Sequence, residues 1–267
     1  YSSLILNSPF CFLHSFNNTQ LESYNYFNQK KLDSIYNPIS YSSNVINNKM
    51  NVVIVIMESL SKEFVGFKNI NDLSLTPFLD SLMLQSLVFN NTYSNGLRSI
   101  EALPAITASI PTLSNTPFIT SVYAQNKFNS LASILSTQNY STSFFHGGTR
   151  GTMGFYSFAK RAGFDNYFGL EEYNDLDDYD GSWGIYDESF FNFFAKKLET
   201  ESQPFFTTFF SLSAHPPYNL PEKYNDVFDE GELEIHKLIS YSDYSLKTFF
   251  ERAKNSYWYN NTIFIIT

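Results

Sequence analysis

The spacing of apolar residues changes abruptly at Asn51. The run NVVIVIM, residues 51–57, is continuous, rich in β-branched side chains and too short for a buried helix, so it predicts a central parallel strand covered on both faces. NYSTSFFHGG and PFFTTFFSLSAHPP predict two further strands, which end at His146 and near His215, and NTIFIIT predicts another.

Segments with helical spacing lie between these strands. In TPFLDSLMLQSLVF, Thr76 is a candidate N-cap, Pro77 takes the first helical position, and the apolar positions up to Leu87 fall near helical spacing. ESFFNFFAKKL and LEIHKLISYSDYSLKTFFERAKN also read as helices. Strands that alternate with helices predict an α/β domain with a mostly parallel central sheet flanked by helices.

Residues 1–50 are polar, rich in Asn, Ser and Tyr, and have no clean period, so we interpret them as a linker or arm, with a candidate helix at residues 19–32, ahead of a domain at 51–267. No apolar run reaches the ~18 residues that cross a bilayer. Because the first residue is Tyr1, we expect a processed or truncated N-terminus and a missing N-terminal membrane anchor.

Composition narrows the function classes. A formal net charge of −9 argues against broad nucleic-acid binding, and 43% hydrophobic with 16% charged residues argues against a disordered chain. The single cysteine, Cys11, excludes an intramolecular disulfide framework and a CxxC zinc site.

Three ligand-capable side chains lie at predicted strand ends. Glu58 follows the first strand, His146 ends the second, and His215 lies near the end of the third. The carboxyl ends of parallel strands converge on one crevice, so we expect these residues on one rim. The alternatives are a solvated glutamate that merely follows a strand and structural histidines.

Ser99 is the natural N-cap of a helix that begins in SNGLRSIEALPAI. A helix N-terminus offers free amides to a phosphate or sulfate ester, Arg98 adds a cation, and a hydroxyl beside a divalent cation can attack phosphorus. The alternative is a plain capping serine.

Two further segments carry candidate substrate-binding residues. His146 precedes a glycine-rich loop that holds Arg150. In the acidic stretch EEYNDLDDYDGSWGIYDES, which lacks the spacing of an EF-hand, Trp183 and Asp187 could face the crevice, although a solvated loop is the simpler interpretation.

Seven pieces in the same order, NVVIVIMESLSKEFVG, TPFLDSL, SNGLRSIEALPAI, FFHGGTRGTMGF with AGFDNYFG, WGIYDESFF, FFSLSAHPPY and NTIFIIT, resemble the lipoteichoic-acid synthase branch of the alkaline phosphatase/sulfatase superfamily. Members are membrane-anchored enzymes with an extracytoplasmic α/β domain. They transfer phosphoglycerol or related head groups, or hydrolyse phosphate or sulfate esters.

The resemblance implies that Glu58 binds a divalent cation, Mn²⁺ or Mg²⁺, together with Ser99, which falls where the family places its nucleophile, commonly Thr. It also implies that His215 lies beside the phosphoryl or leaving group, and that His146 is a strand-end histidine on the substrate side.

Two features depart from the family. Met153 and Phe155 lie near positions where some phosphoglycerol transferases carry Trp and Arg, so glycerol phosphate is not implied as the donor. A strand like NTIFIIT runs in the family into an Asp-His pair that completes the metal site, whereas this sequence stops at Thr267. We therefore expect a fragment with an incomplete metal site.

The expected function is metal-dependent phosphoryl transfer or phosphodiester hydrolysis on the extracytoplasmic face of the membrane. The substrate would be a phosphate or sulfate ester of a lipid head group or glycan. A sulfatase is the nearest enzymatic alternative, but Ser99-Ile100-Glu101 lacks the C/S-x-P-x-R pattern of classical sulfatases. A non-catalytic module that binds glycans or lipid head groups is the alternative from another class.

Overall fold

A computed structural model describes residues 24–37, 49–67 and 74–267. Helices and strands alternate along most of this length. In chain order they are α3 (Gln29–Ile35), β1 (Asn51–Ile56), α4 (Pro77–Met83), α5 (Ser99–Ala108), α6 (Leu131–Ser136), β2 (Ser141–His146), α7 (Phe155–Arg161), β3 (Asn166–Phe168), α8 (Leu170–Tyr173), α9 (Asp187–Leu198), β4 (Phe205–Phe210), α10 (Glu234–Ala253) and β5 (Thr262–Ile266).

The centre of the fold is a five-stranded sheet in the order β3-β2-β4-β1-β5. Every pair of neighbouring strands is parallel. In the middle of the sheet, Val53 of β1 lies opposite Thr207 of β4 on one side and Phe264 of β5 on the other. The predicted α/β fold with a mostly parallel sheet is therefore confirmed.

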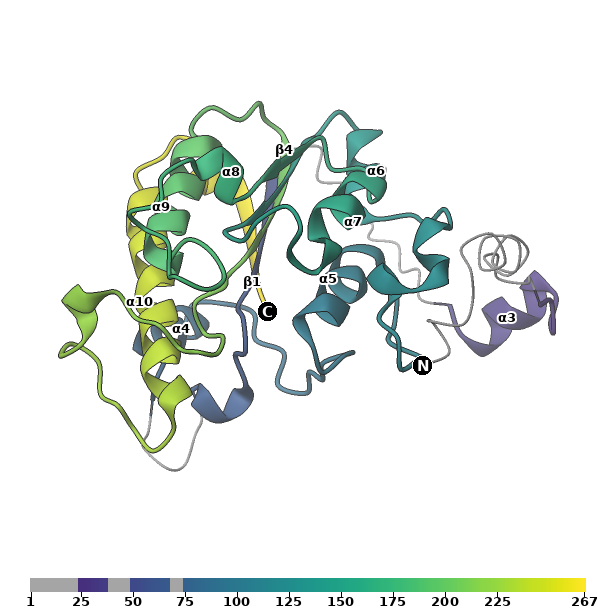
Figure 1. Ribbon diagram of the computed structural model, residues 1–267. Helices are drawn as coiled ribbons and strands as arrows, with labels where there is room; N and C mark the ends of the chain where they lie inside the picture. Colours follow the sequence, from purple (N-terminus) through teal and green to yellow (C-terminus); the bar gives the residue numbers. More distant parts are fainter. Residues whose placement is uncertain (1–23, 38–48, 68–73) are drawn as a thin grey trace, which may run out of the picture.

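Helices cover both faces of this sheet. In Figure 1, α9 and α10 lie on one side and α5, α6 and α7 on the other. Alternation along β1 explains the two layers, because Val53 and Val55 belong to the core beneath α9 and α10, and Ile54 and Ile56 to the opposite core. The continuous apolar run of the sequence thus serves two cores at once.

Phenylalanine supplies much of both cores. Phe205 and Phe209 of β4 face the α9–α10 layer, and Phe206 and Phe210 face the other layer, all at most 2% exposed. The Phe209 ring stacks on Phe191 of α9 with centroids 3.9 Å apart. Since a fully buried phenylalanine contributes roughly 1.5–3 kcal/mol, β4 is firmly anchored, and so are the residues that follow it.

The strands and helices predicted from residue 51 onward are found, some with corrected ends, and the structure adds α6, α7, α8 and β3, which were not predicted. The first helix after β1 ends at Met83, so Leu87 lies beyond it and is 83% exposed. The chain leaves this helix through tight turns, in which the amide of Gln85 donates to the carbonyl of Leu82. The short strand β3 (Asn166–Phe168) was not predicted.

The third predicted strand ends at Phe210, five residues before His215. The amide of Ser211 still donates to the carbonyl of Ile56 in the sheet, at 2.9 Å. The next amide, that of Leu212, instead donates to the carboxylate of Asp187. This change of partner ends β4, so His215 belongs to a loop.

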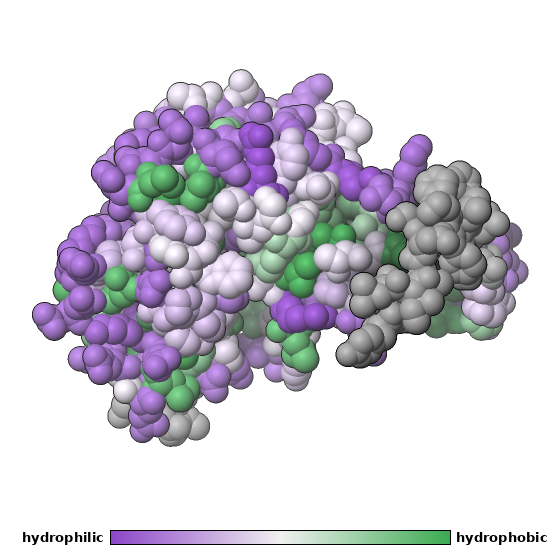
Figure 2. All heavy atoms as spheres, in the orientation of Figure 1, coloured by the Kyte–Doolittle hydropathy of each residue, from purple (hydrophilic) through white to green (hydrophobic). Residues whose placement is uncertain are grey.

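The lead-in is described only in part. Helix α3 has no buried residue and shares only residues 29–32 with the candidate helix at 19–32. Residues 24–28 are not helical, and residues 19–23, like Cys11, lie outside the described residues. The proposed division at residue 50 stays a prediction. In the described part of the chain, no helix combines the length and apolarity needed to cross a membrane. Figure 2 shows a largely polar face on which apolar side chains appear in separate groups.

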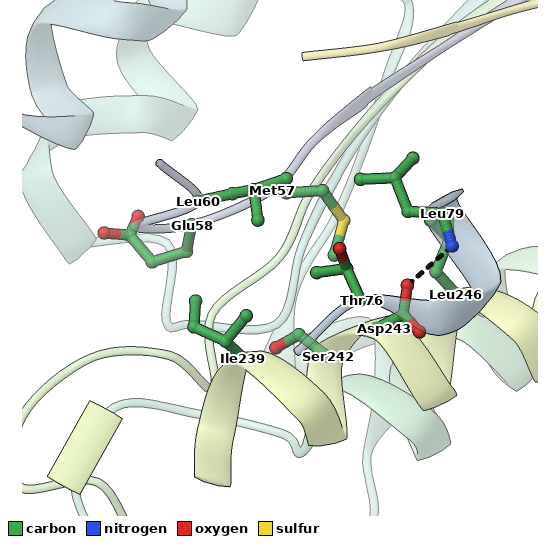
Figure 3. Close-up of a pocket in the computed structure, with 9 residues that line it drawn as sticks. All are labelled: Met57, Glu58, Leu60, Thr76, Leu79, Ile239, Ser242, Asp243 and Leu246. Atoms are coloured by element: carbon green, nitrogen blue, oxygen red, sulfur yellow. Dashed lines mark hydrogen bonds between the residues drawn. The ribbon is translucent and has the colours of Figure 1, made fainter. Parts of the chain in front are cut away.

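Asp243 of α10 holds the start of α4. Its two carboxylate oxygens accept from the amides of Phe78 and Leu79, each at 2.8 Å, and Figure 3 shows the bond to Leu79. These amides are donors that a helix start otherwise leaves unpaired. Burial raises the pKa of Asp243 to about 6. Its side chain joins α10 to α4, two helices that are far apart in sequence.

We predict that Asp243→Ala lowers the free energy of unfolding by about 2 kcal/mol, because one buried and one partly buried amide lose their acceptor. Urea denaturation of the 267-residue chain measures this. The matched control is Ser81→Ala on the exposed side of α4, which should stay within about 0.5 kcal/mol of the parent. Equal midpoints for the two variants would contradict the role of Asp243.

Candidate active site

Glu58 lies just beyond the carboxyl end of β1 and is half-buried. Its amide donates to Ser211 Oγ at 2.7 Å, which fixes its backbone to the residue that follows β4. Its Oε1 accepts from the hydroxyl of Ser59 at 3.0 Å. Figure 3 shows its carboxylate pointing away from a small pocket that Met57, Thr76 and Asp243 help to line.

Ser99 is the first helical residue of α5, and Arg98 is the N-cap, which corrects the prediction that Ser99 caps this helix. Glu101 explains the difference, because its Oε2 accepts from the amides of Leu97 and Arg98 at 2.9 and 3.2 Å. The carboxylate of Glu101 therefore caps the start of α5. The hydroxyl of Ser99 is not used for capping and bonds Glu58 instead.

The hydroxyl of Ser99 lies against the carboxylate of Glu58. Ser99 Oγ is 2.9 Å from Oε1 and 2.8 Å from Oε2 of Glu58. Its single proton is donated to one of these oxygens at a time. The two side chains are 41 residues apart in sequence, and the α/β fold brings them together at the edge where the strands end.

His146 ends β2 on the same edge and is 3% exposed. Its Nδ1 donates to the carbonyl of Phe210 at 3.2 Å, while its Nε2 is buried with no hydrogen-bond partner. Burial lowers the pKa of His146 to about 4, so the ring is neutral at physiological pH. Phe155, near the family's missing arginine position, is itself buried against this ring with centroids 5.0 Å apart.

Asp187, expected to face the substrate, is a buried residue at the start of α9, 1% exposed. Its Oδ1 accepts from the amide of Leu212 at 2.7 Å and its Oδ2 from the hydroxyl of Ser242 at 3.0 Å. Burial raises the pKa of Asp187 to about 6, and the charge of Glu58 adds to the effect. Asp187 therefore fixes the loop after β4 and lies within the electrostatic reach of the site.

Trp183 and His215, both in the described part of the chain, form a pair of their own, with no hydrogen bond to Glu58 or Ser99. Both are half-buried, and their ring centroids lie 4.3 Å apart. The segment that carries Trp183 is a hydrogen-bonded turn, in which Asp180 Oδ1 accepts from three backbone amides. Gly181 and Ser182 at this turn are exposed, whereas Asp180 and Gly184 are buried, so the acidic stretch is solvated in part and ordered by the carboxylate of Asp180.

The two predicted cations are both paired with carboxylates. Arg98 bonds Glu101 through Nε and Nη2, at 3.1 and 2.5 Å from Oε1, and this contact lowers the pKa of Glu101. Arg150 forms an ion pair with Glu172, and its amide donates to Glu171 at 3.1 Å. The structure therefore places both guanidinium groups in local ion pairs, and their role toward a substrate stays a prediction.

A divalent cation would find two adjacent oxygen-bearing side chains here, Glu58 and Ser99. Oxygen donors suit Mg²⁺ and Mn²⁺. Among the residues that the structure describes, no three His, Cys, Asp or Glu side chains are grouped so that they could hold a metal ion. Glu58 and Ser99 thus fit part of the ligand set of such a cation.

Serines that the sequence pattern does not single out hold this site together. Ser211 binds the backbone of Glu58, and the hydroxyl of Ser213 accepts from the amide of Asp187 at 2.9 Å. The only signal in the sequence is the alternation of serine with small or apolar residues in SLSA directly after a strand. Serines with that spacing are equally common in solvated loops, so this signal does not identify a site.

Comparison with known proteins identifies the family. The sequence profile of the Sulfatase family matches residues 50–267, so the chain belongs to the sulfatase family. It is 28% identical over 229 residues to the lipoteichoic acid synthase-like protein YvgJ of Bacillus subtilis, covering 80% of this chain and 36% of that protein. It is 26% identical over 242 residues to phosphoglycerol transferase I of Escherichia fergusonii, covering 83% and 31%.

A crystal structure of an alkaline phosphatase superfamily protein from Vibrio parahaemolyticus has the same fold. It aligns with a TM-score of 0.74 at 33% identity, over 82% of this chain and 53% of that one. The predicted resemblance and fold are confirmed. The chain spans about a third of the length of the two curated relatives.

His146 predicts a specific pH dependence of stability. Its pKa is about 4 in the folded chain and about 6.5 when unfolded. Between these values the unfolded chain binds more protons, so the stability supplied by neutral His146 is present above pH 6.5 and is lost as the pH falls toward 4. Asp187 and Asp243, with raised pKa values, act in the opposite direction, so only a comparison with a variant isolates the histidine.

We expect His146→Gln to be less stable than the parent at pH 7.5 and to gain about 3 kcal/mol relative to it by pH 4, because the penalty for keeping the imidazole neutral disappears. Urea unfolding curves at several pH values measure the difference. Parallel stability profiles for the two proteins would contradict a neutral, buried His146.

Proposed function

We propose that the protein transfers or hydrolyses phosphate esters of the phosphoglycerol or related head-group type, with Ser99 as the nucleophile. The observation that carries this proposal is the contact between Ser99 Oγ and both oxygens of Glu58, at 2.9 and 2.8 Å. A hydroxyl at the start of a helix, held by a carboxylate at the carboxyl edge of a parallel sheet, is well placed to meet an anionic ester.

In the transfer step, a bond forms between Ser99 Oγ and phosphorus as the bond from phosphorus to the alcohol oxygen breaks. The proton of Ser99, which faces the carboxylate of Glu58, is released to water as the hydroxyl ionises, and the departing alcohol takes up a proton from His215. When bound by Glu58 and Ser99, Mn²⁺ or Mg²⁺ would favour the ionised hydroxyl and offset the charge that develops on the phosphoryl oxygens. The hydroxyl of a glycan, a lipid or water then attacks phosphorus and gives its proton to His215, while the bond from phosphorus to Ser99 Oγ breaks and the ionised serine is regenerated.

The proposed substrate is a lipid head group or a glycan ester, and the proposed location is the extracytoplasmic face of the membrane. The names of the relatives support this class, since one is lipoteichoic acid synthase-like and the other a phosphoglycerol transferase. The family also includes sulfate-ester chemistry by its name. Phosphate and sulfate esters are therefore compared directly in the assay below.

The backbone of Thr267, which follows β5, pairs with the end of β1. The amide of Thr267 donates to the carbonyl of Val55 at 3.0 Å, and the amide of Met57 donates to the carbonyl of Thr267 at 2.8 Å. These bonds place Thr267 beside the end of β1, next to the residue that leads into Glu58.

We predict that the 267-residue chain binds Mn²⁺ only weakly, because Glu58 and Ser99 supply two ligands and a catalytic cation normally has about three from the protein. Isothermal titration calorimetry measures the affinity, and Glu58→Gln should abolish the remaining heat. Submicromolar binding by the parent chain would contradict an incomplete site.

We predict that Ser99→Ala lowers turnover of a generic phosphodiester by at least about a thousand-fold in the protein at its natural length, assayed with Mn²⁺ or Mg²⁺, because the nucleophile is removed. Ser99→Thr keeps the hydroxyl and should retain activity. Ser81→Ala, an exposed serine of α4, is the matched control.

The same assay compares phosphatidylglycerol, phosphatidylethanolamine and an aryl sulfate. Faster turnover of the aryl sulfate than of every phosphate ester would identify a sulfatase instead. Unchanged activity in Ser99→Ala would place the nucleophile elsewhere, and a parent protein that binds head groups without turnover would be a binding module.

A further inference from the structure

Trp183 and His215 share one hydrogen-bond acceptor. The indole N–H of Trp183 donates to the carbonyl oxygen of Pro216 at 2.6 Å. The same oxygen lies 2.9 Å from Nδ1 of His215. The two rings also lie against each other, with planes inclined by 59°. The imidazole of His215 thus packs against the indole of Trp183 and bonds the carbonyl oxygen of Pro216 through Nδ1.

This arrangement selects one tautomer of His215. A carbonyl oxygen can only accept, so the Nδ1 that lies beside it must carry a proton. In the neutral ring the lone pair is then on Nε2, and in the protonated ring Nε2 carries the additional proton. Nε2 is therefore the atom of His215 that is available to exchange a proton with another molecule.

The turn that carries Trp183 is held in one conformation by hydrogen bonds and by close packing. Asp180 Oδ1 accepts from the amides of Ser182, Trp183 and Gly184 at 2.8, 2.7 and 3.0 Å. A Cβ at Gly184 would lie 2.3 Å from the carbonyl oxygen of Gly147. Only glycine fits at this close approach, so the turn is pressed against the loop that follows His146.

The same turn is tied to the loop of His215. Asn219 Nδ2 donates to the carbonyl of Asp180 at 2.7 Å and lies 3.3 Å from Ser182 Oγ. Within the loop, the amide of Tyr218 donates to the carbonyl of His215 at 2.9 Å. The turn at 180–184 and the loop at 215–219 therefore behave as one unit, with Trp183 and His215 facing each other across it.

We propose that Trp183 is a positioning residue for His215, which holds the imidazole with Nδ1 on the Pro216 carbonyl and leaves Nε2 to exchange the proton with the ester oxygen. This assignment replaces the expectation that Trp183 contacts the substrate itself. The identity of the ester rests on the proposed function, whereas the pairing and the tautomer do not.

The first test is spectroscopic and needs no substrate. In the 267-residue chain labelled with ¹⁵N-histidine, long-range ¹H–¹⁵N correlation spectra distinguish the two neutral tautomers, and His215→Gln identifies the signal. We expect the Nδ1–H form of His215 to predominate in the parent. Trp183→Ala should shift the population toward the Nε2–H form, and Trp183→Phe, which keeps a ring but loses the indole N–H, should lie between.

The second test uses turnover of a phosphodiester by the protein at its natural length. Trp183→Ala should lower kcat by roughly 10- to 100-fold with little change in KM, because the reacting nitrogen is misplaced while the ester is still bound. In a His215→Ala background the same substitution should change kcat by less than about two-fold, since residues that act as a unit are not additive. Trp183→Phe should restore part of the loss.

Leu176→Ala is the matched control, because Leu176 lies in the same acidic stretch and is 67% exposed. It should change neither the tautomer nor kcat. An unchanged tautomer in Trp183→Ala, or a kcat loss that persists in full without His215, would overturn the proposal. If no ester is turned over at all, the proposed function fails, and the ¹⁵N spectra still decide the role of Trp183.

Discussion

The parallel pairing of β1 with β4 is the constraint on which the site depends. Ile56 lies opposite Phe210, and Ser211, the residue that follows β4, bonds the backbone of Glu58. The carbonyl of Phe210 also holds His146. Since a slip of one residue would turn every buried side chain to the opposite face, the two apolar cores that fix this register also fix where the carboxylate and the imidazole lie.

The strands that could be predicted from the sequence are those in which burial on both faces requires apolar residues at every position. NVVIVIM and FFTTFF are apolar without interruption because both faces of the sheet are covered, and that signal is local. Where elements end was less predictable, because a partner far away in sequence decides it. The amide of Leu212 leaves the sheet for Asp187, 25 residues earlier, and no pattern around His215 reveals this.

The candidate site shows the same division. Strand ends predicted that Glu58 and His146 lie at one edge. The predicted helix start singled out Ser99, and the family resemblance then implied its role as nucleophile. The sequence could not show that Glu101 would act as the cap and leave Ser99 free, because a serine and a glutamate at that spacing both suit a helix start. Nor could it show that Asp187 is buried, since an acidic residue in an acidic stretch is expected in solvent.

The charges around Ser99 explain why the proposed chemistry calls for a cation. Glu58 touches the hydroxyl, and its charge contributes to the raised pKa of Asp187. The two arginines expected to attract an anion are occupied by Glu101 and Glu172. A phosphate ester that approaches Ser99 therefore meets a carboxylate first, and like charges at such distances repel strongly away from bulk water. In the function proposed above, a divalent ion held by Glu58 and Ser99 would offset this repulsion, which is the physical reason why the proposal includes a cation.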